Sequence, residues 1–245
     1  MKNFKLVIEY DGTRYHGWQR QKKDRTIQGE IERALLTITG RKISLIGSGR
    51  TDSGVHALGQ TANFKCDTHH GVDVFFSALN ALLADDIIVK SCEAVDNNFH
   101  ARYSAKSKTY QYRIYNNPLP KAIGRQYAWF IRRPLNIEAM DKAGKFLSGR
   151  HDFKSFEGAG SPRSSTKRTV TKAEIRYSED NYIVFKIEAN GFLRFMVRNI
   201  VGTLVEIGLG KRNAGEMKSI LRKCDRSLAG ATAPAHGLFL VNVTY

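Results

Sequence analysis

Apolar and polar residues alternate in several short stretches of the chain, which predicts strands. Between these stretches lie segments whose apolar residues recur at helical spacing, which predicts helices. In residues 4–10 every second side chain, from Phe4 to Tyr10, is apolar or aromatic. Thr26 is suited to cap a helix whose apolar residues recur at helical spacing before Gly40 ends it. The first hundred residues thus predict the order strand, helix, strand, strand, helix, strand, at residues 4–10, 27–39, 43–46, 61–65, 72–83 and 87–92.

The second half of the chain repeats this order without obvious sequence identity. Its predicted elements are a strand at 108–115, a helix at 136–147, a hairpin of strands 169–177 and 182–189 around residues 179–181, helices at 195–207 and 214–223, and a strand at 238–244. We therefore predict an α+β protein of two split-βαβ halves, residues 1–105 and 106–245. Such units are common in RNA-associated proteins, although a fold alone does not define a function.

Residues 149–168 are rich in glycine, serine and basic side chains. This composition predicts a long, mobile, basic loop, and loops of that length in compact domains are usually functional or disordered. If the loop contacts a polyanion, its Lys and Arg residues contribute to the affinity.

Charge changes the interpretation of the chain. It carries 39 Lys and Arg against 23 Asp and Glu, a net charge of +16. Residues 101–245 hold 26 of these basic residues and only 11 acidic ones, so the excess lies mainly in the second half. A solvated basic surface is one interpretation. A nucleic-acid face built from folded structure is the one we favour.

Other chemistry is poorly supported by the sequence. The three cysteines lie far apart and form no CxxC pair, and the seven histidines form no HExxH or other metal-ligand spacing. No stretch of 18 apolar residues occurs. We expect a soluble, cytoplasmic protein with no metal and no disulfide framework.

The strongest chemical signal is the glycine-rich segment 47–56, which reads GSGRTDSGVH. It follows a predicted strand, but it matches neither the P-loop pattern nor GxGxxG, so a phosphate-binding loop is disfavoured. The glycines can instead hold Asp52 in a tight turn beside Arg50. Asp52 is either an ordinary turn residue or a carboxylate nucleophile, and its place in a basic protein favours the second interpretation.

Two residues of the second half also invite a functional interpretation. Tyr110 on its predicted strand can stack on a nucleobase, although tyrosines on such strands often belong to the core. Arg198 interrupts an apolar helix. It needs a carboxylate partner if it is buried, and otherwise its guanidinium extends to solvent.

Several motifs resemble one known family. Residues 49–57, GRTDSGVHA, resemble the GRTDAGVHA signature of the A-type tRNA pseudouridine synthases, with Ser53 where alanine is usual. Ser53 keeps a small side chain beside the acid. The match extends along the chain, in order, through EYDG at 9–12, GWQRQ at 17–21, FHAR at 99–102, KTY at 108–110 and MVRNIVG at 196–202.

The resemblance implies a specific reaction and site. Enzymes of this family isomerise uridine to pseudouridine at positions 38, 39 and 40 of tRNA, without cofactor or metal. Asp52 matches the nucleophile, Tyr110 the ring that packs on uracil, and Arg198 the partner of the aspartate. Arg50 is expected to replace the flipped base in its stack or to hold its phosphate, and Leu238 to contact substrate. Whether Asp52 attacks the sugar, the base or drives an elimination stays open, and Tyr110 is the candidate base for the proton on carbon 5.

The resemblance also implies architecture and partners. The two halves are expected to join in one mainly antiparallel sheet with helices on one face and an active-site cleft between the halves. The first half would carry the Asp52 loop, and the second, strongly basic half would complete the cleft. A homodimer that binds the anticodon stem-loop and body of tRNA is expected, with no membrane association. A non-catalytic double RNA-binding module is the alternative; it would explain charge and topology, but not the loop around Asp52.

Overall fold

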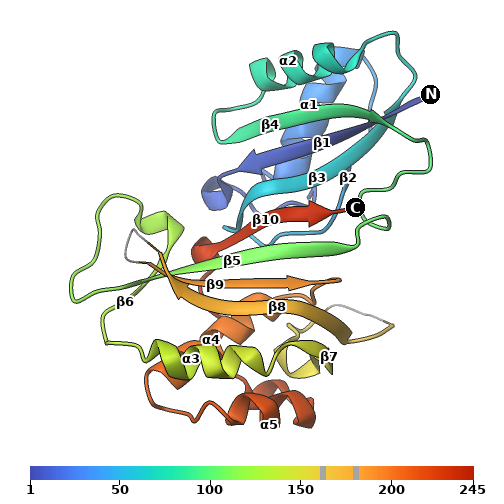
Figure 1. Cartoon of the computed structure of the whole chain (residues 1–245). Coiled ribbons are helices and arrows are strands. Elements are labelled where there is room, and N and C mark those ends of the chain that lie inside the picture. Colours follow the sequence, from blue (N-terminus) through green and yellow to red (C-terminus); the bar gives the residue numbers. More distant parts are fainter. Residues whose placement is uncertain (161–163, 179–181) are drawn as a thin grey trace. The chain divides into compact units, whose positions relative to one another are not determined.

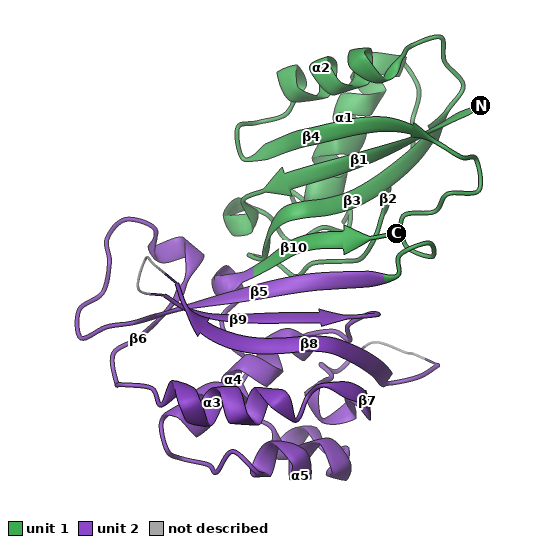
Figure 2. Ribbon diagram, viewed as in Figure 1, with its two compact units in different colours: residues 1–106, 239–245 green, residues 107–238 purple. Residues whose placement is uncertain are grey.

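The computed structural model describes residues 1–160, 164–178 and 182–245. Its residues form two compact units, residues 1–106 with 239–245 (unit 1) and residues 107–238 (unit 2) (Figures 1 and 2). The described residues contain ten strands and five α-helices, and most strand pairs are antiparallel. The predicted α+β class is confirmed.

Residues 1–106 of unit 1 have the predicted order of elements, and one strand from the end of the chain joins them. They are β1 (Lys2–Tyr10), α1 (Ile27–Thr39), β2 (Ile46–Gly47), β3 (His56–Cys66), α2 (Val72–Leu82), β4 (Ile87–Val95) and β10 (Leu238–Thr244), of which Leu238 is the last residue of unit 2. The strands run in the order β4-β1-β3-β10, and β2 pairs with β3. β10 is parallel to β3, with Phe239 opposite His56, and the other pairs are antiparallel.

The place of β10 differs from the sequence prediction. The sequence prediction assigns residues 238–244 to the second half, 106–245. The structure places residues 239–245 in unit 1, where β10 gives β3 a second long neighbour. Strand pairing between residues far apart in sequence leaves no local pattern that could reveal this.

The core of unit 1 follows the alternation predicted for the first strand. Phe4, Leu6 and Ile8 are at most 1% exposed. The Phe4 ring packs against Phe64 of β3 and Phe75 of α2, with centroids 5.2 and 4.7 Å apart. One face of β1 is thus covered, as the period of two requires.

Helix α1 begins and ends where its sequence predicts. The Thr26 side chain accepts a hydrogen bond from the Gly29 amide, and Gly40 ends the helix in the left-handed region at φ 67°. Both are standard devices for satisfying helix-terminal groups.

The strand predicted at residues 43–46 is wrong except for its last residue. Ile43 and Leu45 are buried, as the alternation implied. The Leu45 amide, however, donates to Glu32 Oε1 at 3.0 Å, and its carbonyl accepts from Gln28 Nε2 at 2.9 Å. Side chains of α1 therefore take the backbone hydrogen bonds that a strand would use.

Unit 2 contains the remaining elements. They are β5 (Ser107–Asn116), β6 (Trp129–Ile131), α3 (Ile137–Lys145), β7 (Gly149–Asp152), β8 (Lys167–Tyr177), β9 (Tyr182–Ala189), α4 (Met196–Gly208) and α5 (Glu216–Lys223). The strand order is β5-β9-β8-β7, with β6 parallel to β5. The antiparallel hairpin of β8 and β9 is confirmed, and residues 179–181 of its predicted turn lie outside the described residues.

Helix α4 lies deep in unit 2 and approaches another backbone segment closely. Most of its residues are buried. A Cβ added at Gly202 would overlap the carbonyl oxygen of Ala231. Thr203 Oγ1 accepts the Gly230 amide at 2.8 Å, so helix and segment are joined where they touch. Glycine is required here because a helix backbone contacts a second backbone.

The mobile loop predicted at residues 149–168 is largely wrong. Gly149–Asp152 form β7, paired with β8, and Lys154–Phe156 form a short 3-10 helix. Phe153 and Phe156 are fully buried, which fixes the segment to the core despite its glycine- and serine-rich sequence. Residues 161–163 lie outside the described residues.

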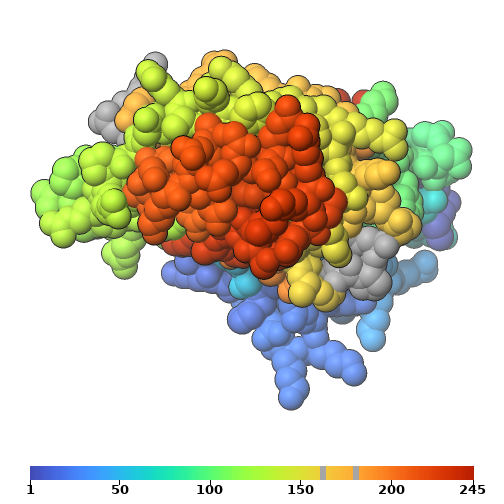
Figure 3. Space-filling model, turned by 90° about the horizontal axis from the view of Figure 1, so that it is seen from below, coloured from blue at the N-terminus to red at the C-terminus, as the bar shows by residue number. Residues whose placement is uncertain are grey.

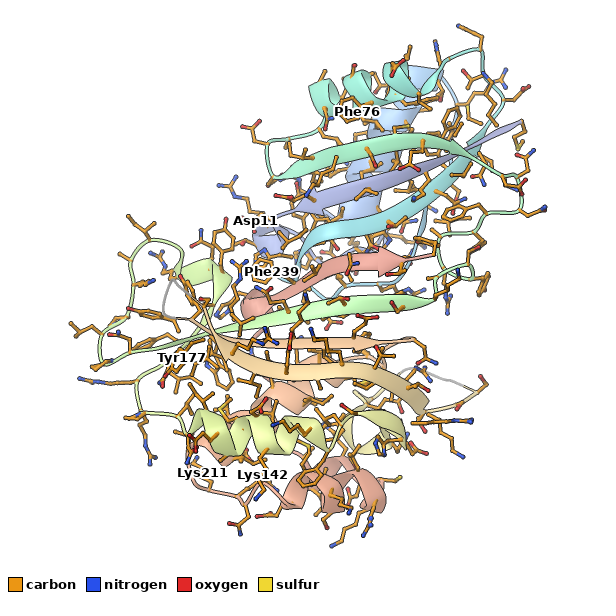
Figure 4. All side chains as sticks on the ribbon, in the orientation of Figure 1. Asp11, Phe76, Lys142, Tyr177, Lys211 and Phe239 are labelled. Carbon is orange, nitrogen blue, oxygen red and sulfur yellow. The ribbon has the colours of Figure 1, made fainter. Side chains whose placement is uncertain are left out.

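Basic side chains are exposed over much of unit 2. α5 and the segment before it, in the orange-red surface of Figure 3, carry Lys211, Lys218, Arg222 and Lys223. Figure 4 labels Lys142 on α3 and Lys211, which follows the end of α4, in the lower part of the view. Within the described ranges, no helix is both long and apolar enough to span a membrane.

Candidate active site

Asp52 lies in the loop of residues 48–55, which connects β2 to β3 in unit 1 (the Asp52 loop). The Trp18 amide donates to the Thr51 carbonyl at 3.1 Å, and the Val55 amide donates to the Asp52 carbonyl at 3.1 Å. Gly54 has φ 76°, which lets the loop turn back on itself. The backbone on both sides of the half-buried Asp52 is therefore fixed.

A second segment, residues 12–18, packs directly on the Asp52 loop. A Cβ at Gly12 would overlap the carbonyl oxygen of Val55. Gly17 has φ 86°. A Cβ added there would lie 2.6 Å from the Thr51 carbonyl oxygen and 3.1 Å from the Asp52 carbonyl carbon. The motifs at 9–12 and 17–21 thus lie against the motif at 49–57, and their glycines make that approach possible.

Buried hydrogen bonds join the Asp52 loop to residues of β1 and β3. Tyr10 OH lies 2.7 Å from Thr51 Oγ1. Ser48 Oγ donates to Gln60 Oε1 at 2.7 Å, and Gln60 Nε2 donates to the Gly49 carbonyl at 3.0 Å. Burial raises the pKa of Tyr10 well above its usual range, so its phenol stays protonated. The network holds the loop rigid in a low-dielectric setting.

His56 joins this loop to the start of β3. It is 1% exposed, and its ring stacks on Phe239 with centroids 4.7 Å apart. Its Nδ1 lies 3.0 Å from Asp11 Oδ1 and 3.1 Å from the Gly12 amide. Figure 4 labels Asp11, which directly follows β1, and Phe239, near the start of β10. An unprotonated Nδ1 accepts from Gly12, whereas a protonated Nδ1 pairs with Asp11.

Arg50 belongs to the same loop but is exposed. Its Nε donates to Gln19 Oε1 at 3.0 Å, and Gln19 Nε2 donates to Gln28 Oε1 at 2.9 Å. The side chain is therefore tethered at Nε to the motif at 17–21. Its role toward a flipped base or a phosphate stays a prediction.

Tyr110 lies on β5 of unit 2. It is 8% exposed, and its ring meets Phe192 edge-on, with centroids 4.9 Å apart and planes at 80°. Two residues along the strand, Tyr112 is fully buried and donates to the Pro234 carbonyl at 2.8 Å. Tyr112 is therefore core, as we expected, whereas Tyr110 keeps one small exposed part.

Arg198 lies in the first turn of α4 and is half-buried. Its Nε donates to the Ala233 carbonyl at 2.7 Å, and the Ala233 amide donates to the Arg198 carbonyl at 3.1 Å. The guanidinium lies 5.0 Å from the Phe195 ring centroid. Asp52 belongs to unit 1 and Arg198 to unit 2, and their pairing stays a prediction.

Leu238 begins β10 and is 5% exposed. The residue before it, Gly237, lies so close to Tyr112 that an added Cβ would be 2.7 Å from ring carbon Cζ. Nearby His236 is half-buried. Burial and, to a smaller extent, the positive charge of Arg198 lower the pKa of its imidazole. The segment 233–238 thus runs past both Tyr112 and Arg198, and substrate contact by Leu238 stays a prediction.

Sequence reasoning missed Phe195. It is one of two non-glycine residues in the described part of the chain with positive φ, at 60°, a conformation that costs free energy and is often found at functional sites. Its ring contacts the backbone of Gly158, where an added Cβ would overlap the ring. The guanidinium groups of Arg194 and Arg198 lie 4.6 and 5.0 Å from its centroid. The only sequence signal was an aromatic residue between two arginines.

Replacing Phe195 by leucine is expected to lower kcat about tenfold with little change in KM, because the cation–π contact that orients Arg198 is lost. Steady-state kinetics on tRNA, the substrate that the sequence resemblance implies, measure this change in kcat. Phe195→Tyr keeps the ring and serves as the matched control, with activity near that of the wild type. A leucine variant with wild-type kcat would show that the ring does not position Arg198.

Among the described residues, no group of three or more His, Cys, Asp or Glu side chains is placed to hold a metal ion.

Comparison with known proteins gives one consistent family. The family model described as tRNA pseudouridine synthase matches residues 6–104 and 143–245. The chain is 49% identical to tRNA pseudouridine synthase A of Acetivibrio thermocellus and 49% identical to the protein of that name from Thermoanaerobacter sp., over the full length of all three chains. The solved structure titled "Crystal structure of the archaeal box H/ACA sRNP Nop10-Cbf5 complex" matches this chain with a TM-score of 0.37 and 9% identity, over 82% of this chain and 44% of that chain. By the family match and the identity to these relatives, the chain belongs to the tRNA pseudouridine synthase family.

Proposed function

We propose that this protein isomerises uridine to pseudouridine at positions 38, 39 and 40 in the anticodon stem-loop of tRNA, with Asp52 as the nucleophile. The names of its relatives and its family support the reaction. The position of the Asp52 side chain is the observation that supports its role as nucleophile. A half-buried carboxylate stands on a loop whose backbone is fixed by Trp18 and Val55.

The chemistry fits the residues. The bond between ribose C1′ and uracil N1 breaks, a bond between C1′ and C5 forms, the proton leaves C5, and N1 gains a proton, so the product has the composition of the substrate. A carboxylate nucleophile divides such an exchange into two steps. Attack on the ribose, attack on the base and elimination would each begin at Asp52. Tyr110, with its small exposed part, is the candidate base for the C5 proton.

Two arginines complete the proposed site. Arg198, held by Ala233 and Phe195, would keep Asp52 ionised, because a nearby positive charge favours the carboxylate. A uridine must leave its stack to reach the carboxylate, at a cost of a few kcal/mol. Arg50, exposed beside Asp52 in the chain, would occupy the vacated stack or hold the phosphate.

The exposed basic residues of unit 2 support tRNA as the polyanion. We further propose that the protein acts in the cytoplasm and that it forms a homodimer, as the family resemblance implies for its oligomeric state. Light scattering of the purified protein at micromolar concentration measures the oligomeric state.

The reaction is tested with tRNA transcripts that carry tritium at uridine C5. We expect the wild-type protein to release label from transcripts with uridine at position 38, 39 or 40, in proportion to the uridines at those positions. A transcript with cytidine at all three positions is the control and should release none. Tight binding without release would favour the alternative, a non-catalytic RNA-binding module.

A further inference from the structure

The loop at residues 99–104 of unit 1, which contains the FHAR motif, is fixed by buried polar side chains of the sheet. Ala101, which is fully buried, donates from its amide to Asn63 Oδ1 at 2.9 Å, and its carbonyl accepts from Tyr245 OH at 2.8 Å. Asn3 Nδ2 donates to the Phe99 carbonyl at 3.0 Å. Asn63 Nδ2 in turn donates to Asn3 Oδ1 at 3.0 Å. The loop lies beside the end of β10 (Figure 1), and its backbone has little freedom.

On this fixed backbone stands a cluster of three side chains, His100, Arg102 and Tyr103. The rings of His100 and Tyr103 lie 4.3 Å apart with planes at 33°, and the Arg102 guanidinium lies 5.5 Å from the Tyr103 centroid. His100 Nδ1 accepts the amides of Arg102 and Tyr103 at 3.2 and 3.3 Å, which leaves Nε2 as the donor of the neutral ring.

Tyr103 is 75% exposed despite this support. Most large apolar rings are buried because burial is favourable, so a fixed loop that presents one to solvent does not stabilise the fold through that ring. An exposed ring bordered by a guanidinium and an imidazole N–H has the features of a site for a nucleobase and its phosphate. The ring stacks on the base, and the cation binds the phosphate.

The cluster lies far from the candidate active site within unit 1. The Asp52 loop precedes His56 at the start of β3, whereas Asn63, which holds the cluster's loop, is seven residues further along the same strand. At about 3.3 Å per residue, the part of β3 from His56 to Asn63 is about 23 Å long. Asp52 lies near the His56 end of its loop, because its carbonyl accepts the Val55 amide at 3.1 Å. A nucleotide bound here is therefore not the target uridine.

We propose that His100, Arg102 and Tyr103 form a second RNA-binding site, which stacks on one unpaired nucleobase of the tRNA substrate and contacts its phosphate. The proposal rests on the proposed function for the identity of the RNA. The acidic residue nearest to the cluster in sequence is Asp96, and its Oδ1 accepts the Asn98 amide at 2.7 Å. Because the site is remote from Asp52, it contributes to RNA affinity and leaves the chemical step unchanged.

The test compares direct tRNA binding of Tyr103→Ala and Arg102→Ala with the wild type, at several salt concentrations. Loss of one stacked base is expected to raise the Kd about tenfold for Tyr103→Ala. Arg102→Ala should weaken binding and reduce the slope of log K against log salt by about 0.7 to 0.9, the value for one phosphate contact. In turnover, KM should rise and kcat should stay at the wild-type value.

Three controls make the result specific. Tyr103→Phe keeps the ring and should bind like the wild type. Arg33→Ala removes one exposed arginine from α1 of the same unit, so it measures the effect of charge alone. Thermal melting shows that each variant is folded. Wild-type affinity of Tyr103→Ala, or an equal loss in Arg33→Ala, would overturn the proposal. Binding is measured without turnover, so a failure of the proposed reaction would leave this result readable.

Discussion

Replacing Asp52 by asparagine is expected to abolish the release of tritium from C5-labelled tRNA, with a loss of more than about 10⁴-fold in kcat. An amide is a poor nucleophile and carries no charge for Arg198 to pair with. The Val55 amide donates to the Asp52 carbonyl and the Trp18 amide donates to the neighbouring Thr51 carbonyl, so the loop should keep its shape. We therefore expect tRNA to bind the variant with nearly wild-type affinity.

Two further variants make this result specific. Asp52→Ala removes the side chain and cannot revert by deamidation, so it must be equally inactive. Ser53→Ala alters the exposed neighbour, whose Oγ donates to the Tyr15 carbonyl at 3.2 Å, and should retain most activity. Measurable pseudouridine formation by Asp52→Ala would contradict the nucleophile role.

The largest effect on stability is expected for Gly202→Ala in α4. The added methyl group would overlap the Ala231 carbonyl oxygen and lie 2.9 Å from its carbonyl carbon. Because both elements are backbone, no side-chain rotation relieves the overlap. The free energy of unfolding should fall by more than about 3 kcal/mol, and the Tm by about 10 °C. Thermal and urea denaturation measure both quantities.

Gly144→Ala is the matched control for this substitution. Gly144 also lies in a helix of unit 2, α3, but an added Cβ there would have no neighbour within 4 Å. Alanine favours a helix over glycine by up to about 1 kcal/mol, so the Tm should stay the same or rise slightly. Equal melting temperatures for the two variants would show that α4 can move away from residue 231.

Local elements were predictable where local chemistry determines them. Thr26 and Gly40 mark the ends of α1, and the alternation from Phe4 to Tyr10 marks a strand with one buried face. β7 could not be predicted, because Gly149–Asp152 has no apolar alternation and forms a strand only through its pairing with β8. The short β6 at Trp129–Ile131 is likewise defined by its pairing with β5.

The candidate site shows the same division. The motif at 49–57 predicts Asp52 as the nucleophile through its resemblance to a family signature, and that role stays a prediction. The packing of Gly17 on the loop depends on a left-handed residue and a contact over more than thirty positions, which composition does not reveal. Phe195 was missed for a related reason, since aromatic residues rarely adopt positive φ.

The position of β10 bears on how the protein is made. Unit 1 receives this strand only after the whole of unit 2 has been synthesised, because residues 107–238 intervene in the chain. A nascent chain on the ribosome would therefore hold β3 with one open edge during that interval, and open strand edges favour misassembly. Unit 2 is complete in the chain before unit 1, whose last residues, 239–245, are made after it. A fragment that ends at residue 106 would lack β10, so β3, the strand that follows the Asp52 loop, would lose this neighbour.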